Sequence, residues 1–574
     1  MSTVTSSYRT NNVSKFIEDV NTDVSGNKYY IFGSSTTISR SGNNEISKRE
    51  FLERTLFGKR ITTDNLFYLI DNNRWISGKV FDQYDDTVDL SSKKFYTIVY
   101  PSDNLTGDYR IYKCLFNNYG SAVSDPPNYL DIDNDQVYRT ADGYVWKYMY
   151  SITPIDFDKY RALSYVPIIV DSNTGMEPIT GRSVGNILVT NADKNKGYEF
   201  IRKGSVIRVT ETEIEISAPT LSNIPNYYTG QNFYIITEGI VGGLYTIANY
   251  SYNVINGSAV ITLKENVDLL TENSLVKPNY EFSIFPKIEI TGDGTGAIAI
   301  PNFSDQDMTG TIISVEILNQ GEGYTNSAAR VINPAYGFDT ITASDLDVSA
   351  ELRVILSPIG GHASKPELLP GEEETDKTVL LRKAAKFAEE LKSKRVLIYG
   401  NLTETDNAFI PSSNVYTKVG IVKNPNITPW EEDENTRPDV VDNRLQLSIN
   451  NNTLVTDEIV TQTDINTGEI TFNAIVHEVV GDTVFLTSFH GPYKNYPNTT
   501  ETEEGYADIP INLKRPIISS QGQALNINKD GLGNYIVSRP RYIQKTGEVY
   551  YLTNFSPMTR TPSSKEEYKI VLEF

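Results

Sequence analysis

The chain has 574 residues, and its 52 basic and 73 acidic side chains give a formal net charge of −21 at pH 7. The single Cys excludes a disulfide-stapled fold and Cys-based zinc modules, and three widely spaced His leave little for a His-rich metal site. A sequence pI near 4.8 argues against a broadly nucleic-acid-binding surface. The length predicts roughly three or four domains of about 150 residues.

Neither export nor membrane insertion is indicated by the sequence. The opening residues, MSTVTSSYRT, lack the charged and then apolar segments of a signal peptide. The longest apolar runs, at 66–70, 165–170 and 396–399, are far shorter than the roughly 20 residues of a membrane-spanning helix. We therefore expect synthesis in a reducing cytosol and no membrane insertion.

The predicted elements are mostly β-strands, because period-two or β-branched runs recur between Gly, Asn, Pro and Asp turns. In chain order, the first is a short helix with Ser47 as its N-cap, which places Phe51, Leu52, Thr55 and Leu56 on one face. The clearest predicted strands are 94–100, 109–116, 205–209, 259–263, 312–318 and 483–487. Asn256-Gly257 predicts a hairpin before 259–263.

One longer helix is predicted over 378–392, capped by Thr375 or Asp376, with an apolar stripe at helical spacing. The stripe consists of Leu380, Leu381, Ala384, Phe387, Ala388 and Leu391. The predicted fold class is mainly β (all-β to α+β) with few short helices. Polar, turn-rich stretches at 171–182, 360–377, 425–439 and 493–507 predict linkers or exposed loops.

A weak internal repeat joins residues 186–198, NILVTNADKNKGY, to residues 314–324, SVEILNQGEGY. Both segments have an apolar alternation, an Asn and a closing Gly-Tyr pair. Asn and Gly supply the positive φ that ends a strand, and the Tyr then covers the turn. The repeat indicates either a small β-module used twice or one module split by an insertion.

No motif in the chain predicts enzymatic chemistry. The Gly-rich segment 292–296 is followed by a predicted strand, whereas a phosphate-binding P-loop is followed by a helix, so a turn is favoured. The acidic runs 131–135 and 372–374 are candidates for calcium binding, but the first lacks the ligand spacing of a calcium loop, and a solvated loop is favoured. Adjacent carboxylates at 85–86 and 431–433 do not define a glycosidase pair, because sequence proximity does not fix their separation.

The remaining candidates for chemistry also have ordinary structural explanations. Cys114 lies in an alternating strand without a fixed His partner, so a buried thiol is expected. His362 follows two glycines, and we interpret it as part of a tight turn. We predict no catalytic residue, no cofactor and no metal site.

Two stretches, 73–84 and 142–150, are dense in aromatic residues. In the second, Tyr144, Trp146 and Tyr148 share one face of a predicted strand, while Val145, Lys147 and Met149 lie on the other. Three large aromatic side chains on one face form either a core layer or a binding ladder. The periodicity favours the core layer.

The same stretches carry a resemblance to a known family. The motif of Asp142, Gly143, Tyr144, Val145 and Trp146 (DGYVW), extended by KYMYSI, is similar to one in baseplate wedge subunits of the gene product 8 type from T-even-like, contractile-tailed bacteriophages. Other segments resemble that family in the same order along the chain. They are 7–16, 29–35, 72–75 with Trp75, 111–115, 165–168, 415–425 ending in Asn424 and Pro425, 547–557 beginning with Gly547 and Glu548, and 566–574.

The resemblance implies a discontinuous, β-rich family core with two inserted β-modules. The core comprises 1–170, 411–428 and the C-terminal hairpin 541–574. The insertions are 171–410, which contains the helix 378–392, and 429–540. We expect β-modules at about 183–358 and 430–540 to project from the core, and we expect the family-motif residues to be core or interface residues.

The resemblance also implies a non-enzymatic structural protein of the virion tail baseplate, assembled in the host cytoplasm. Its implied partners are a second copy, as a homodimer, and other baseplate wedge proteins, without nucleic acid. Such subunits move as rigid bodies during the baseplate rearrangement that triggers sheath contraction. A carbohydrate-binding adhesin or fibre-type protein at the virion periphery is the alternative, and a polysaccharide depolymerase is a third hypothesis. Long repeats or trimeric heptads typical of fibres are not visible in the sequence.

Overall fold

The computed structural model contains mainly β-structure, which confirms the predicted fold class. Contacts divide the chain into two compact units, described separately below: Met1–Asn11 with Tyr68–Lys394, and Asn12–Phe67 with Arg395–Phe574. The structure describes residues 6–21, 25–34, 45–85, 87–90, 92–103, 107–128, 137–171, 182–198, 201–209, 213–218, 221–237, 240–265, 280–304, 310–332, 349–357, 372–373, 375–401, 416, 418–427, 440–450, 453–491, 511–538, 540–554 and 567–574.

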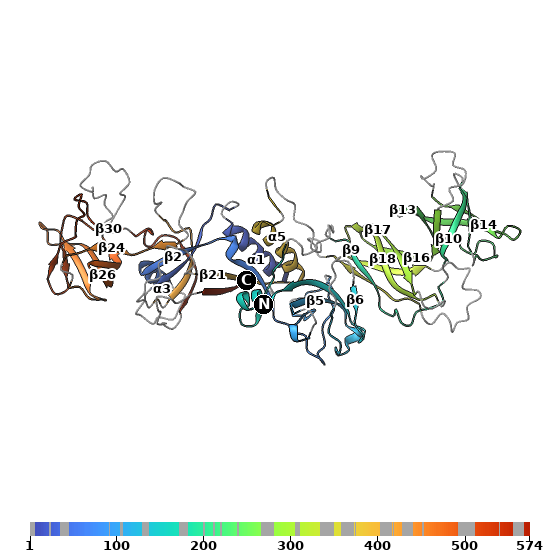
Figure 1. Ribbon diagram of the computed structural model, residues 1–574, viewed down its shortest axis with the longest axis horizontal. Helices are drawn as coiled ribbons and strands as arrows, with labels where there is room; N and C mark the ends of the chain where they lie inside the picture. The colour runs from blue at the N-terminus through green and yellow to red at the C-terminus, as the bar shows by residue number, and fades with distance from the viewer. Residues whose placement is uncertain are drawn as a thin grey trace. The chain divides into compact units, whose positions relative to one another are not determined.

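The first unit contains an antiparallel sheet in the order β4-β5-β7-β6. Figure 1 labels β5 and β6 of this sheet. Its strands are β4 (Tyr96–Val99), β5 (Tyr109–Phe116), β6 (Val137–Arg139) and β7 (Val145–Ile152). β5 has the predicted bounds, and β4 lies inside the predicted 94–100. Nearby elements are β3 (Leu66–Asp71), which pairs with β8 (Tyr165–Pro167), the helix α4 (Pro154–Tyr160), and the 3₁₀ turns η2 (Pro101–Asp103) and η3 (Asn118–Gly120).

A closed, six-stranded antiparallel barrel lies within residues 201–285, in the order β10-β11-β14-β13-β12-β15. Its strands are β10 (Ile201–Val209), β11 (Glu213–Ser217), β12 (Asn232–Thr237), β13 (Ile240–Asn253), β14 (Ser258–Leu263) and β15 (Tyr280–Phe285). The predicted strands 205–209 and 259–263 are confirmed. The Asn256-Gly257 hairpin joins β13 to β14 as predicted, with Gly257 at φ +63°.

A second β-module flanks the barrel in sequence. Its strands are β9 (Val184–Val189), β16 (Lys287–Gly292), β17 (Thr295–Phe303), β18 (Ile312–Glu322), β19 (Ser327–Ile332) and β20 (Leu352–Leu356). β9, which precedes the barrel, pairs antiparallel with β20, which follows it. Val184 and Ile187 of β9 share one buried cluster with Ile288 and Tyr324.

The two repeat segments belong to this one module, so the second of the two open interpretations is correct. Tyr198 N donates to Gly310 O at 3.2 Å, and Tyr324 N donates to Arg182 O at 2.8 Å. Each closing Tyr is therefore bonded to a residue that lies four positions before the other repeat segment. The barrel is the insertion that separates them in sequence.

The helix α5 (Lys377–Glu390) confirms the helix predicted over 378–392, with Asp376 at the N-cap position and Leu391 at the C-cap. Ala384, Phe387 and Ala388 are buried, as the predicted stripe requires. Lys383 and Glu390 are buried as well, which the pattern did not predict.

The second unit contains a five-stranded antiparallel sheet in the order β23-β2-β1-β22-β31. Its strands are β1 (Tyr29–Ser34), β2 (Thr55–Ile61), β22 (Lys418–Lys423), β23 (Val440–Asp442) and β31 (Glu548–Asn554). A further pair joins β21 (Arg395–Asn401) to β32 (Glu567–Glu573). The helices α1 (Ser6–Val20) and α3 (Glu45–Glu53) and the 3₁₀ turn η1 (Thr63–Asn65) complete this part.

The helix predicted after Ser47 has the wrong limits. α3 begins at Glu45, so Ser47 lies inside the helix and is not its N-cap, and Leu56 belongs to β2. The helix ends before the β-branched Thr55, whose hydroxyl donates back to Phe51 O at 2.8 Å. Neither α1 nor α4 was predicted from the sequence.

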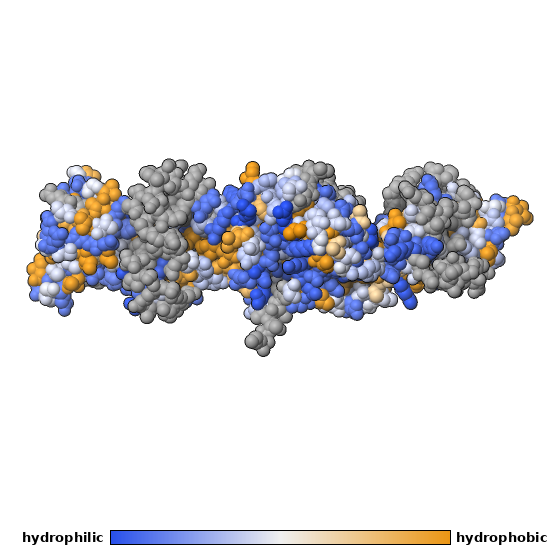
Figure 2. Space-filling model, turned by 90° about the horizontal axis from the view of Figure 1, so that it is seen from below, coloured by the Kyte–Doolittle hydropathy of each residue, from blue (hydrophilic) through white to orange (hydrophobic). Residues whose placement is uncertain are grey.

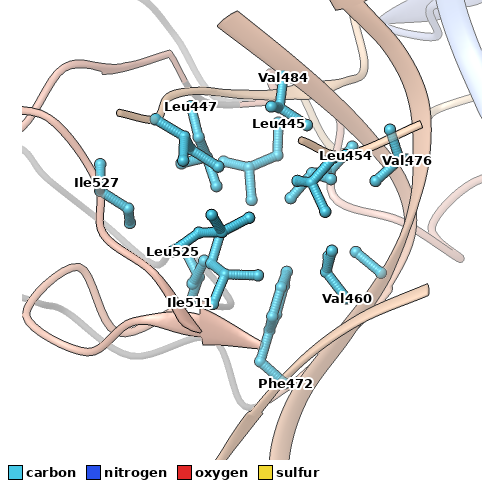
Figure 3. Packing of buried hydrophobic residues seen from close by; sticks show 14 of the residues in the cluster. Leu445, Leu447, Leu454, Val460, Phe472, Val476, Val484, Ile511, Leu525 and Ile527 are labelled. Carbon is cyan, nitrogen blue, oxygen red and sulfur yellow. The ribbon is translucent and has the colours of Figure 1, made fainter. Parts of the chain in front are cut away.

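A seven-stranded antiparallel sheet lies within 445–538, in the order β29-β28-β25-β26-β27-β24-β30. Its strands are β24 (Leu445–Ser448), β25 (Ile459–Thr463), β26 (Ile470–Val480), β27 (Thr483–His490), β28 (Ile517–Ser519), β29 (Ala524–Leu525) and β30 (Val537–Ser538). Figure 3 shows side chains from several of these strands, among them Leu445, Val460 and Phe472, packed into one apolar interior. The module therefore has its own hydrophobic core.

Several predicted features lie wholly or largely outside the described residues. They are the linkers and loops at 171–182, 360–377, 425–439 and 493–507, the acidic runs 131–135 and 431–433, Asp86 and His362. Of the helices in the described part of the chain, none is both long and apolar enough to cross a membrane.

Candidate functional site

Aromatic side chains from three segments meet in one buried cluster of the first unit. The cluster comprises Trp75, Phe81, Val99, Tyr112, Cys114, Val123, Tyr144 and Trp146. Trp146 stacks on Tyr144 with ring centroids 5.4 Å apart and meets Phe81 edge to face, also at 5.4 Å. Tyr148 packs against the cluster from the same strand face, so the predicted core layer is confirmed.

The turn before β7 is closed by Asp142. Its carboxylate accepts hydrogen bonds from the backbone N of Ser124 at 2.8 Å and of Asp125 at 3.1 Å, and from the hydroxyl of Thr140 at 2.5 Å. Burial would raise the pKa of Asp142, but these hydrogen bonds outweigh it and hold the pKa below its ordinary value. These bonds favour the ionised carboxylate, which holds the turn.

Gly143 is required at this turn for two reasons. Its φ is +84°, and a Cβ at this position would lie 2.9 Å from the side chain of Asn118. Asn118 Nδ2 donates to Asp142 O at 3.0 Å, which fixes that side chain against the glycine. Tyr144 then donates its hydroxyl to Ser121 O. The family-like motif therefore forms a turn, whose Asp142 and Tyr144 side chains are hydrogen-bonded within the protein, and a strand in which Val145 and Trp146 are buried.

Cys114 belongs to the same cluster and is fully buried. Burial raises the pKa of its thiol well above the usual range, because the low-polarity surroundings disfavour the thiolate. The predicted buried thiol is confirmed.

The other predicted residues meet at one end of the five-stranded sheet in the second unit. β22 ends at Lys423 and β31 begins at Glu548, and these two residues are register partners. Asn424, at φ +50°, donates its backbone N–H to Lys28 O at 2.7 Å and accepts Lys28 N on Oδ1 at 2.8 Å. A Cβ on Gly547 would lie 2.9 Å from Pro425 Cα, so these two chain segments touch through the glycine.

A polar and aromatic cluster next to this junction was missed by the sequence analysis. Asp19 accepts hydrogen bonds from Lys423 Nζ and Asn27 Nδ2, both at 2.6 Å, and from the Tyr29 hydroxyl. Burial would raise the pKa of Asp19, but these bonds lower it overall. Phe16 stacks on Tyr550 beside them, with centroids 5.3 Å apart.

The signal for this cluster was present in the sequence of α1. Its buried side chains Val13, Phe16, Ile17 and Val20 follow the i, i+3, i+4, i+7 spacing of an amphipathic helix. This apolar stripe is narrow and lies within a polar segment, so the helix was not predicted from the sequence.

The Gly-rich segment 292–296 is a strand-to-strand connection between β16 and β17, as predicted. The Asp293 carboxylate accepts the backbone N of Thr325 at 2.8 Å and of Asn326 at 2.9 Å. A hydrogen bond from the Thr325 hydroxyl, together with these two backbone donors, lowers the pKa of Asp293 well below its usual range. A phosphate-binding loop offers backbone N–H groups at the start of a helix. Here the anionic Asp293 takes up the backbone N–H groups and a strand follows, so the segment does not have the features of a phosphate-binding loop.

Asp85 lies in the wall of a cavity of ≈ 330 Å³ in the first unit, together with Arg353 and Ser327. Arg353 Nη1 donates to Leu115 O at 3.0 Å and Nη2 donates to Tyr84 O at 3.1 Å. Asp85 accepts from the hydroxyl of Thr87 at 2.6 Å. The charged groups in this wall are thus bonded to the protein itself. Across the described residues, no group of three or more His, Cys, Asp or Glu is placed to hold a metal ion.

A buried polar network crosses the seven-stranded module. Arg444 contacts the two carboxylate oxygens of Asp442, each at 3.1 Å, and Glu478 Oε2 at 3.3 Å. Its guanidinium also lies 4.1 Å from the centre of the Phe485 ring. Neighbouring His477 has its pKa lowered to about 4, because burial disfavours the imidazolium and Arg444 repels it, while Asp442 offsets part of this effect.

His477 should therefore make the stability of this module depend on pH. In the unfolded chain His477 has an ordinary pKa near 6.5, so the unfolded state takes up a proton at a higher pH than the folded state does. The contribution of neutral His477 to the free energy of unfolding is therefore fully present above pH 6.5 and is lost as the pH falls towards 4. We expect a loss on the order of 2–3 kcal/mol over this window in denaturant titrations. His477→Gln should flatten that part of the profile, whereas His490→Gln should keep it. Identical profiles for wild type and His477→Gln would contradict this assignment.

In comparisons with known proteins, no family model matches this chain, and no curated protein sequence matches it.

Proposed function

We propose that this chain is a structural, non-enzymatic subunit of a bacteriophage contractile-tail baseplate wedge. One observation supports the proposal above the others. The resembling segments 29–35, 415–425 and 547–557 supply three neighbouring strands of one sheet, β1, β22 and β31. Short segments that matched by chance would have no reason to be neighbours in the fold.

The register of these strands is continuous across long separations in sequence. Ile31 pairs with Ile421, and Ile421 pairs in turn with Tyr551. The backbone hydrogen bonds of the central strands are thus satisfied by segments from the two ends of the chain. This is the arrangement expected of a discontinuous core into which other modules have been inserted.

The first unit gives the same kind of support. The resembling segments 72–75, 111–115 and 142–146 contribute Trp75, Cys114 and Trp146 to a single buried cluster. β5 and β7, which carry two of these segments, pair directly at Cys114 and Trp146. The segments that carry the resemblance therefore pack together in this unit also.

In the proposed role, the β-modules act as rigid bodies whose contacts with neighbours change. Each described module has its own buried core, so it can keep its shape while an interface is exchanged. A net charge of −21 keeps the free subunit soluble before assembly. Its partners would be a second copy of the chain and other wedge proteins, which would together mediate wedge assembly and the rearrangement that triggers sheath contraction.

Reconstitution with the encoding phage tests this proposal. Tails should lack complete baseplates when the gene is interrupted, and adding purified chain to the extract should restore contractile tails seen by negative-stain electron microscopy. Sedimentation velocity at micromolar concentration should give twice the chain mass of 64.3 kDa. A denatured sample of the chain is the control.

Other results would overturn the proposal. Normal tails without the chain, combined with glycan-array binding and a peripheral position on the virion, would identify an adhesin or fibre-type protein. Cleavage of a host polysaccharide would identify a depolymerase. Sedimentation as a monomer would contradict the proposed homodimer and leave the other parts of the proposal standing.

A further inference from the structure

The hairpin between β13 and β14 ends in two exposed aliphatic side chains. Val254 is 78% exposed and Ile255 is 94% exposed at the tip. Figure 2 shows hydrophobic surface, in orange, at the right of the view, the side on which Figure 1 labels β13 and β14. Turn positions are usually occupied by Gly, Asn, Asp or Ser, which makes two adjacent aliphatic residues unusual there.

The tip is held in one conformation by its own hydrogen bonds. Asn253 Oδ1 accepts the backbone N of Ile255 at 3.0 Å, and Gly257 N donates to Asn253 O at 3.0 Å. Gly257 takes a positive φ that closes the loop. Val254 and Ile255 are therefore presented on a preorganised loop, which lowers the entropy lost when a partner covers them.

A loop with the same two hydrogen bonds occurs in the seven-stranded module. Between β25 and β26, Asp464 Oδ1 accepts Asn466 N at 2.8 Å, and Gly468 N donates to Asp464 O at 2.8 Å. Ile465 occupies the position that matches Val254, and it is also largely exposed. Two separate modules thus end in a rigid Asx-and-Gly loop that presents an aliphatic side chain.

The composition of the first hairpin identifies the kind of surface that covers it. Residues 240–263 contain no Asp, Glu, Lys or Arg, although charged residues make up 22% of the chain. Tyr245 and Tyr252 lie in the same hairpin, half-buried against the barrel core. Interface cores between proteins are poor in charge and rich in aromatic residues, whereas lipid headgroups and nucleic acids are held through Lys and Arg.

We propose that the tip formed by residues 253–257 is a docking site for a protein partner that offers an uncharged, apolar socket. Val254 and Ile255 enter the socket, and the uncharged sides of the hairpin line its rim. Contiguous exposed apolar surface is a common mark of interaction sites, and the two side chains are adjacent on a hairpin without charged residues. The inference goes beyond the proposed function and does not depend on it, because it rests on the exposure, hydrogen bonds and composition of the hairpin loops.

Site-specific crosslinking of the full chain tests this docking site. A photoreactive benzoylphenylalanine replaces Ile255 in the chain expressed in its native cells, and the crosslinked protein is identified, purified and titrated against the chain. We expect the double variant Val254→Ser/Ile255→Ser to bind that protein at least about tenfold more weakly, since truncation of buried anchor residues has effects of this size. Leu532→Ser, at an aliphatic side chain that is 86% exposed in another module, is the matched control and should bind as wild type does.

The controls separate docking from folding and from other ligands. The double variant should keep the melting temperature of wild type, because its side chains face solvent. Binding of wild type to vesicles of phosphatidylglycerol and phosphatidylethanolamine, lost in the double variant, would show a lipid-inserting tip and overturn the inference. Crosslinks only between copies of this chain, or equal affinity of the double variant and wild type for the captured protein, would overturn it too.

Discussion

Replacing Glu390 by Gln is expected to lower the free energy of unfolding by about 3–5 kcal/mol, because it leaves a buried ammonium without its counter-charge. Lys113 on β5 and Glu390 at the end of α5 form an ion pair in which Lys113 is 3% and Glu390 0% exposed. The Lys113 ammonium also lies 4.0 Å from the centre of the Tyr84 ring. Equilibrium unfolding in urea, followed by tryptophan fluorescence, measures the change.

A double variant distinguishes the broken pair from general damage to the core. Lys113→Met/Glu390→Met removes both charges and should recover most of the stability lost in Glu390→Gln, because apolar side chains of similar length can replace a buried pair at little cost. If the double variant is less stable than the single one, the pair is not the cause of the loss. The single Lys113→Met variant completes the cycle.

Replacing Trp146 by Ala is expected to cost about 3–5 kcal/mol, the range for removal of a large buried aromatic side chain. Trp146 is fully buried between Tyr144 and Phe81. Its Nε1 has no hydrogen-bond partner among the described residues, so Trp146→Phe should cost much less. The same urea titration, followed by circular dichroism, measures both variants.

The Trp146 variants also test the choice between a core layer and a binding ladder. Ile155→Ala on α4, at a side chain that is 79% exposed, is the control and should change stability by less than about 0.5 kcal/mol. A Trp146→Ala protein with the stability of wild type would contradict the core assignment. The aromatic side chains on this face of β7 would then be a candidate binding surface.

The sequence predicted best where one local pattern decides the structure. β5 alternates along its length and is terminated by Asn117, so its limits were predicted correctly. α5 has a stripe at helical spacing and an Asp at its N-cap, and it was also found. α3 was misplaced because the apolar spacing of its last turn continues into β2, where Thr55 and Leu56 are strand residues.

The missed features depend on contacts between distant segments. Nothing in the local sequence around Lys113 indicates that its partner is Glu390. The repeat could not show that a barrel separates its halves, because that follows from the pairing of β9 with β20. In the candidate site, the aromatic layer was predicted, whereas the turn at Asp142-Gly143 and the junction of Asn424 with Lys28 were not.

A density map of intact tails from the encoding phage tests the central claim most directly. We expect the sheet of β1, β22 and β31 and the aromatic cluster around Trp146 both to fit density within the baseplate wedges. We also expect the chain to be present there as pairs of copies in contact with other wedge proteins. A baseplate without this chain, or density for it only in peripheral fibres, would contradict the account.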